Sequence, residues 1–338
     1  MQIAPPLSTM QNSKPEVLWI TVQKCSKFLI PDNMLIYILK RTLLALLVAL
    51  TVSAISFGLL YLSGDPAAAI AGESATDEDI IYVRKIYGFD RPVAIQYLDW
   101  VGKVFRGNFG KSYYFNLPVS EILASRLPVT LKLGASAICF ALLLSTPLGV
   151  VAAMWPNSWI DRLALTLSIM GQALPSFWFA LILILLLSIK FPLLPPSGSE
   201  SWVHFIMPTV VLGYFAMPAI MRLTRTGMME VLASDYIRTA RAKGISETAV
   251  ILKHALRNAL APVITVLGLQ LGYLFGGIIV VESLFNYTGM GWLTYQALLN
   301  RDVPLIQASV FMIAAVFMLS NLIVDLIYKV LDPRIRFE

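Results

Sequence analysis

The chain has 338 residues, of which 57% are hydrophobic and only 14% are charged, and its mean hydropathy is +0.73. This composition excludes an ordinary soluble globular domain and indicates a protein that lies mostly in a membrane. The net charge of +6 comes from basic segments beside the apolar ones, so it does not indicate a nucleic-acid partner. The two cysteines and two histidines are not at metal-ligand spacing, so the sequence predicts neither a metal site nor a catalytic site.

Six apolar segments approach the ~20 residues that a helix needs to cross a ~30 Å hydrocarbon core. They cover residues 38–62, 129–153, 163–189, 205–226, 259–284 and 305–329. Because a backbone in lipid has to satisfy its own hydrogen bonds, each segment predicts a helix. The expected fold class is therefore an all-α polytopic membrane protein with six transmembrane helices. Pro175 in the third span, and Pro208 and Pro218 in the fourth, should kink or loosen their helices.

The first 33 residues precede Met34, where a strong membrane-anchor pattern begins, and several prolines interrupt them. Two interpretations are open: a mobile extension (or residues upstream of the true start), and a short interfacial helix around Val17 to Phe28. The first span is too long for the apolar region of a cleavable signal peptide.

Residues 63–127 form a long amphipathic connection that begins with Gly64-Asp65-Pro66. We expect short helices around 77–87 and 92–105, near the outer membrane surface. Gly110-Lys111-Ser112 resembles the end of a phosphate-binding loop, but the glycine required five residues earlier is Phe105. The sequence therefore predicts no ATP site and no cofactor in this chain.

The distribution of Lys and Arg predicts the orientation. Most of the 26 basic residues fall in the two termini, at Arg162 and between Arg222 and Arg257, all on one side of a six-span chain. Cytoplasmic segments carry such an excess, so both termini and residues 227–257 should face the cytoplasm. Residues 63–127 and 285–304 should then face outside.

A polar, basic segment follows the fourth span and predicts two short helices. Ser234 or Asp235 can cap the first helix, because both side chains accept a hydrogen bond from a free backbone N–H. Arg241 and Lys243 fall in its last turn, where cations complement the helix dipole. Gly244 is placed to end it with a positive φ.

Ser246 can cap the second helix, which should carry Leu252, Leu256 and Leu260 into the membrane at a spacing of four. The alternative is an ordinary solvated basic loop. Paired caps around a glycine favour a compact surface on which a soluble partner docks.

These residues resemble the cytoplasmic loop of ABC importer permeases, in particular those of the dipeptide, oligopeptide and nickel branch. The resemblance rests on Asp-Tyr-Ile-Arg-Thr-Ala-Arg-Ala-Lys-Gly at 235–244 and His-Ala-Leu-Arg-Asn-Ala-Leu-Ala-Pro at 254–262. In the Glu-Ala-Ala slots of the broader family pattern stand Arg238, Thr239 and Ala240, as in the peptide branch. His254, Ala255, Leu256 and Arg257 occupy the Ile-x-Leu-Pro slots. Further matches are Gly64-Asp65-Pro66 and residues 267–270, 281–286, 289–291, 301–304, 321–325 and 332–336, whereas Tyr287-Thr288 replaces the usual Trp-Pro.

The resemblance, which runs from Met34 to the C-terminus, implies a type I ABC importer transmembrane domain. It divides the chain into an extension (1–33), a first helix with an extracytoplasmic loop (34–117), and a five-helix core (118–330) that holds the coupling loop (227–257). It implies that the contact with the ATPase is made by Asp235, Tyr236, Ile237, Arg238, Thr239, Ala240, Arg241, Lys243 and Gly244.

The implied partners are a second homologous permease, two ABC ATPase subunits that bind the ATP, an extracytoplasmic substrate-binding protein and the lipid bilayer. The expected location is the inner (plasma) membrane. The chain is expected to be a transport subunit and not an enzyme.

Polar residues within the last two spans are candidates for the translocation pathway: Gln270, Glu282 and Asn321. Gln270 could instead make an interhelical hydrogen bond, and Glu282 could simply reach the outer interface. Asp325 stands four residues before Lys329, which predicts an ion pair on the helix surface.

Di- and oligopeptides are the expected substrates, with glutathione, opines and nickel chelates as alternatives. The short connection from Lys190 to Val203 resembles that of glutathione-type relatives. Two other classes are weighed: an ATP-independent channel or secondary transporter, and a membrane scaffold. The first does not explain the basic segment, and the second does not explain the polar residues in the spans.

Overall fold

The computed structural model describes residues 34–62, 65–72 and 75–331, and in these ranges all the regular structure is helical. The expected helix around Val17 to Phe28 and the matching residues 332–336 lie outside the described residues. The chain divides between Val48 and Ala49 into two units, and the packing reported below is that of the second unit.

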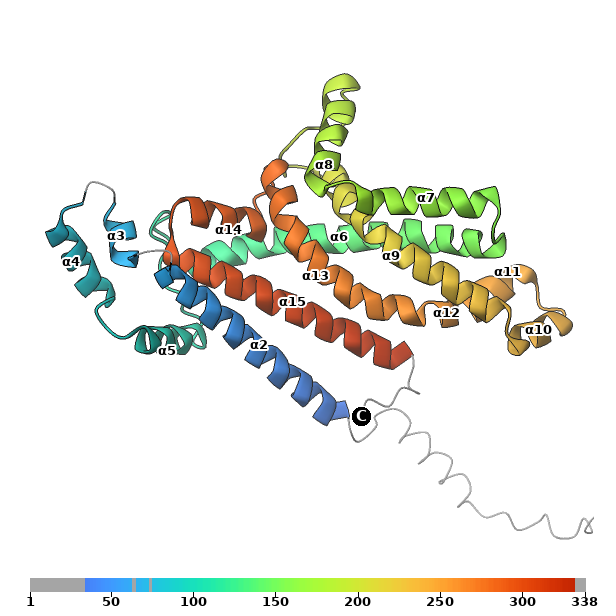
Figure 1. Ribbon diagram of the computed structural model, residues 1–338, viewed down its shortest axis with the longest axis horizontal. Coiled ribbons are helices and arrows are strands. Elements are labelled where there is room, and N and C mark those ends of the chain that lie inside the picture. The colour runs from blue at the N-terminus through green and yellow to red at the C-terminus, as the bar shows by residue number, and fades with distance from the viewer. Residues whose placement is uncertain (1–33, 63–64, 73–74, 332–338) are drawn as a thin grey trace, which may run out of the picture. The chain divides into compact units, whose positions relative to one another are not determined.

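The helices are labelled as in Figure 1. They are α2 (Met34–Leu62), α3 (Pro66–Ala71), α4 (Asp77–Tyr87), α5 (Val93–Val104), α6 (Val119–Met154), α7 (Trp159–Ala173), α8 (Ser176–Ile184), α9 (Ile206–Leu232), α10 (Asp235–Ala242), α11 (Glu247–Ala249), α12 (Leu256–Ala259), α13 (Ala261–Leu284), α14 (Met290–Leu299) and α15 (Val303–Leu331). A π-helical turn continues α8 over Leu185–Lys190, another joins α11 to α12 over Val250–Ala255, and a short 3₁₀ turn, Trp202–Phe205, precedes α9.

Within the described residues, five helices are long and apolar enough to cross a membrane by themselves. A sixth span is a broken pair, α7 and α8, which meet at an angle of 103°. The structure therefore agrees with six predicted spans, but the third is not one continuous helix. Pro175 is the N-cap of α8 and has no N–H to donate, so the backbone turns at this point.

The other prolines leave their helices continuous. Pro208 lies in the first turn of α9, where the missing N–H has no intrahelical partner to lose, and Pro218 does not interrupt that helix. Two further internal prolines, Pro128 and Pro147, are accommodated within α6.

The second unit is built around α9, which packs on α6, α7 and α13, while α13 also packs on α15 (Figure 1). Glycines bring the backbones close together. A Cβ added at Gly149 of α6 would lie 2.9 Å from the Met221 carbonyl oxygen, and one at Gly213 of α9 would lie 2.7 Å from that of Ala137. Small residues at such crossings are typical of helices packed within a membrane.

The two short helices expected between the first two spans are confirmed as α4 and α5. Thr76 and Asp79 form a capping box at the start of α4, with hydrogen bonds of 3.3 and 3.0 Å, and Gly88 ends that helix at φ +70°. Farther along the connection, the carboxylate of Asp302 accepts hydrogen bonds from the Ser112 hydroxyl (2.5 Å) and the Tyr114 N–H (3.1 Å). Residues 112–114 are thereby tied to the joint between α14 and α15.

Candidate functional site

The basic segment, residues 234–258, is fixed to the ends of the membrane helices by one face of α10. Ile237 and Ala240 are buried on this face. They belong to an apolar cluster that includes the end of α6, the end of α9 and the turn before α12: Val150, Ala153, Met228, Val250, Ile251, Ala255 and Ala259. The helix α10 therefore packs directly on the ends of α6 and α9 and on α12.

The other face of α10 is exposed and carries the residues predicted to meet a partner: Asp235, Tyr236, Arg238, Thr239 and Arg241, with Lys243 just beyond. Its cations have acidic neighbours within the chain. Arg238 pairs with Asp235 at 3.1 Å, and Arg241 donates two hydrogen bonds to Glu247 at 2.6 and 3.1 Å. These bonds from Arg241 lower the pKa of the Glu247 carboxyl. The exposed face thus carries ion pairs, and its net charge is less positive than the number of Lys and Arg residues alone predicts.

Gly244 adopts φ +74°, which confirms the predicted end of the first helix. The predicted caps are confirmed in position but not in bonding. Ser234 and Ser246 precede α10 and α11, yet neither side chain accepts a capping hydrogen bond. The Ser234 hydroxyl instead donates to the Val231 carbonyl oxygen at 2.5 Å, because it turns back to the last turn of α9.

The expected single second helix is wrong, since α11, a π-helical turn and α12 replace it. The wider turn changes which side chains face inward: Leu252 is exposed, whereas Leu256 is partly buried. Tyr236 supports this geometry. Its hydroxyl accepts a hydrogen bond from Asn258 Nδ2 at 2.7 Å, which ties α10 to α12.

A buried ion pair that the sequence did not reveal lies close to this segment. Arg225 of α9 makes a bidentate pair with Asp161 of α7 at 2.6 and 2.7 Å, and Asp161 also accepts the Asn157 N–H at 2.9 Å. The Asp161 side chain is only 3% exposed. The pair joins α7 to the part of α9 that leads into α10.

Of the candidate pathway residues, Glu282 has the most polar contacts. It does not reach the surface of the chain: it is fully buried, and its carboxylate accepts the Thr130 hydroxyl at 2.6 Å and the Trp292 N–H at 3.0 Å. Gly291 leaves room for it, since an added Cβ would lie 3.1 Å from Glu282 Oε2. Glu282 therefore holds together α6, α13 and the start of α14.

Gln270 is buried on α13, and Asn321 lies between α13 and α15. Asn321 Nδ2 donates to the Phe317 carbonyl oxygen at 3.2 Å, and its Oδ1 would be 2.9 Å from a Cβ at Gly268. Their part in a pathway, like that of Glu282, stays a prediction. The predicted partner of Asp325 is the Lys329 side chain, which lies outside the described residues.

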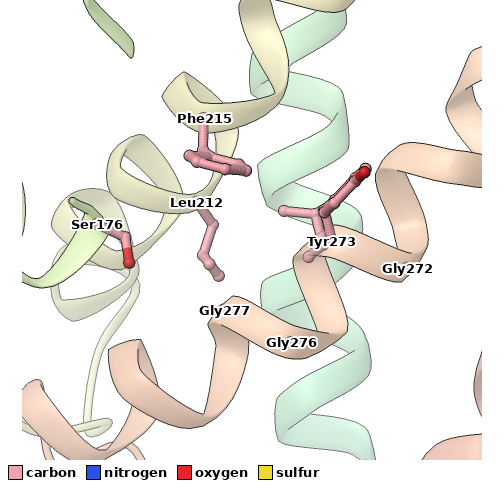
Figure 2. A pocket seen from close by; sticks show the side chains of 8 residues that line it. Ser176, Leu212, Phe215, Gly272, Tyr273, Gly276 and Gly277 are labelled. Atoms are coloured by element: carbon pink, nitrogen blue, oxygen red, sulfur yellow. The ribbon is translucent and has the colours of Figure 1, made fainter. Parts of the chain in front are cut away.

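A pocket of about 300 Å³ lies where α8, α9 and α13 meet (Figure 2). Apart from the hydroxyls of Ser176 and Tyr273, its lining is apolar, and neither residue was predicted to be part of a site. The only signal was the glycine pair Gly276-Gly277 on α13, where an added Cβ would meet no atom closer than 3.6 Å. The lining consists of Ser176, Leu212, Phe215, Gly272, Tyr273, Leu274, Gly276 and Gly277.

Comparison with known families identifies the class. Residues 145–337 match the binding-protein-dependent transport system inner membrane component family, and residues 34–134 match the N-terminal region of such membrane components. The chain belongs to this family. It is a permease component of an ABC importer, a multi-pass inner-membrane protein whose class works with ATPase and binding-protein partners. It is a transport subunit and not an enzyme.

Among individual relatives, the glutathione transport system permease protein GsiC of Salmonella typhimurium is 42% identical over 306 residues. That alignment covers 90% of this chain and all of the relative, and the protein of the same name from Escherichia coli K12 is 40% identical over the same length. An inward-facing structure of the MetNI methionine ABC transporter shares the fold, with a TM-score of 0.53 at 16% identity, over 62% of this chain and 96% of that one.

Proposed function

We propose that this chain forms half of the translocation pore of an ATP-driven importer of small peptides, and that glutathione, itself a tripeptide, is the first substrate to test. The observation that carries this proposal is the 42% identity to a glutathione permease over the whole length of that relative. Di- and oligopeptides are the second candidates, favoured by the loop sequence at 235–244. Opines and nickel chelates remain alternatives.

The proposed role of α10 is to receive the movement of an ATPase subunit. In its support, Tyr236, Arg238 and Arg241 are exposed, while Ile237 and Ala240 fix the helix to the ends of α6, α9 and α12. In this proposal ATP is bound by two ATPase subunits, a second permease completes the pore, and a binding protein delivers the substrate outside. We also propose that both termini face the cytoplasm. The proposed division of the chain is a first helix with its extracytoplasmic loop at 34–117 and a five-helix core at 118–330.

The test is uptake by the whole transporter in proteoliposomes: this chain, its partner permease, the ATPase subunits and the binding protein. We expect ATP-dependent accumulation of labelled glutathione, which unlabelled glutathione competes away and nickel does not. A control complex with an ATPase subunit that binds but does not hydrolyse ATP should accumulate none.

Accumulation of dipeptides without glutathione would move the proposal to its second substrate class. Uptake that is equally fast without ATP would contradict the importer mechanism and favour a channel or secondary transporter.

A further inference from the structure

The short helix α5 is anchored to helices that cross the membrane. The hydroxyls of Tyr97 and Ser53 are 2.8 Å apart, and both lie 2.9 Å from the Leu50 carbonyl oxygen of α2. The Tyr97 and Phe57 rings pack edge to face with centroids 5.5 Å apart. On the other side, Trp100 meets Phe311 of α15 edge to face at 6.0 Å.

These contacts place α5 beside two candidate membrane spans, close to one end of each. Phe57 and Phe311 both lie inside the candidate spans, Leu39–Gly58 and Val303–Ile327. At 1.5 Å per residue, Phe57 is about 7 Å from the end of α2 and Phe311 about 12 Å from the start of α15. Interfacial helices bury their apolar face about 5–10 Å into the boundary between headgroups and acyl chains, which is a similar depth.

One strip of α5 is apolar and uncovered. Ala94, Ile95, Leu98, Gly102 and Phe105 are exposed, with Leu98 at 66% and Phe105 at 67%. At 3.6 residues per turn they occupy a continuous arc of about 100°, as wide as the apolar stripe of an amphipathic helix. This apolar arc borders the face that packs on α2 and α15.

The polar residues of α5 gather on the other border of the apolar arc. Asp99, Lys103 and Arg106 are exposed there, and Asp99 pairs with Arg91 at 2.6 Å. Lys103 and Arg106 are long cations whose stems can lie along apolar surface while their heads reach phosphate groups. The order around the helix is thus packed face, apolar arc and cationic arc.

We propose that α5 is an interfacial membrane helix, with Ile95, Leu98 and Phe105 inserted among phospholipid acyl chains and Lys103 and Arg106 at the level of the lipid phosphates. The bilayer is the occupant that the observations favour, because the apolar arc borders the face by which α5 packs on two candidate membrane spans, Leu39–Gly58 and Val303–Ile327. A binding protein or partner subunit on the same arc is the alternative that the test has to exclude.

The experiment places a nitroxide label at single cysteines of the full chain, assembled with its partners in lipid nanodiscs, after Cys25 and Cys139 are replaced by Ser. The test variants are Leu98→Cys and Phe105→Cys. Lys103→Cys on the cationic arc is the matched control, and Glu78→Cys in the exposed first turn of α4 is the control for water. Collisions with oxygen, which concentrates in hydrocarbon, are compared with collisions of a nickel chelate, which stays in water.

We expect the ratio of oxygen to nickel-chelate collisions at Leu98 and Phe105 to be severalfold higher than at Lys103, and the ratio at Glu78 to be the lowest. A ratio at Leu98 equal to that at Lys103 would place the apolar arc in water and overturn the proposal. Exclusion of both reagents at Leu98 and Phe105 would show that protein covers the arc, which also overturns it.

Discussion

At the scale of single residues, both oxygens of the Glu282 carboxylate act as acceptors. The Thr130 hydroxyl accepts the Met290 N–H at 2.7 Å and so donates its own proton to one oxygen, while the Trp292 N–H donates to the other. In a fully buried site no water can replace a lost partner. Glu282 therefore links three helices through hydrogen bonds in which both of its carboxylate oxygens accept.

The first prediction is that Glu282→Gln destabilises the protein. Whichever way the amide turns, its NH₂ group faces an N–H or O–H donor, and a buried donor left without an acceptor costs about 1–3 kcal/mol. The measurement is thermal unfolding in detergent. Glu121→Gln, an exposed change in the first turn of α6, is the control and should unfold like wild type. If both variants unfold at the same temperature, the role given to Glu282 is contradicted.

The second prediction concerns the ion pair between Asp161 and Arg225. Removing the carboxylate in Asp161→Ala leaves a guanidinium that is 19% exposed without its partner, a change that costs about 3–5 kcal/mol at buried pairs. Asp235→Ala breaks a pair whose side chains are 80% and 93% exposed, and it should change stability little. Unfolding midpoints of the two variants in the same detergent test this contrast, and similar midpoints would refute it.

At the scale of elements, the coupling role proposed for α10 requires that its angle to α12 is fixed. The turn between them depends on Gly244 at φ +74°, where a Cβ would meet nothing within 4 Å. The cost of a substitution there is backbone strain and not crowding.

The third prediction is that Gly244→Val reduces the transport obtained per ATP hydrolysed while the chain still inserts. A β-branched residue at positive φ costs about 1–3 kcal/mol, so the turn relaxes and α10 tilts. Gly244→Asn is the matched control, because Asn tolerates this conformation. The ratio of uptake to ATPase activity should fall for Val and stay near wild type for Asn. An unchanged ratio for Val would show that Gly244 does not set the angle of α10.

The fourth prediction is that replacing Arg238, Arg241 and Lys243 together by Ala weakens copurification with the ATPase subunits, and that added salt loosens the wild-type contact. Because Asp235 and Glu247 already pair with two of these residues, each single replacement should have little effect. Tyr236→Ala should be the most damaging single change, because it also releases Asn258. If the triple variant copurifies as well as wild type at every salt concentration, these cations serve only to orient the chain in the membrane.

Elements with local signals were predictable from the sequence. Thr76, Asp79 and Gly88 define α4 within a dozen residues, and Gly244 ends α10 through its own backbone freedom. The break at Pro175 was foreseen only as a kink, because proline alone does not decide the outcome: Pro147 and Pro218 lie inside continuous helices. What differs is the packing around each proline, which the sequence does not display.

Partners that are far apart in the chain were not predictable. Glu282 was predicted as a polar residue within a span, and Arg225 was counted only among the basic residues between Arg222 and Arg257. Thr130, however, stands 152 positions from Glu282, and Asp161 stands 64 from Arg225. No local sequence pattern predicts a contact between residues so far apart in the chain. The pocket beside α13 was not predicted for a related reason, because the residues that line it come from three helices.

At the scale of the whole molecule, an even number of spans places both termini on one side, so one pair of labels tests the orientation. This is the fifth prediction: a thiol introduced as Glu78→Cys in α4 reacts with a membrane-impermeant reagent from outside, and Ser246→Cys does not until the membrane is opened. The reason is the excess of Lys and Arg on the side of the basic segment. Labelling of Ser246→Cys from outside, without labelling of Glu78→Cys, would show that the chain has the opposite orientation.

The bond between Asp302 and Ser112 joins positions 190 residues apart, and this has a consequence for the order of assembly during synthesis. A ribosome delivers α2 to α13 to the membrane before Asp302 exists, so residues 112–114 have to wait for their acceptor until α15 follows. Thr130 likewise inserts long before Glu282 is made. The corner where α6, α14 and α15 meet is therefore the last part of the chain to close. In a nascent chain that ends before Asp302, the Ser112 hydroxyl and the Tyr114 N–H still lack their acceptor.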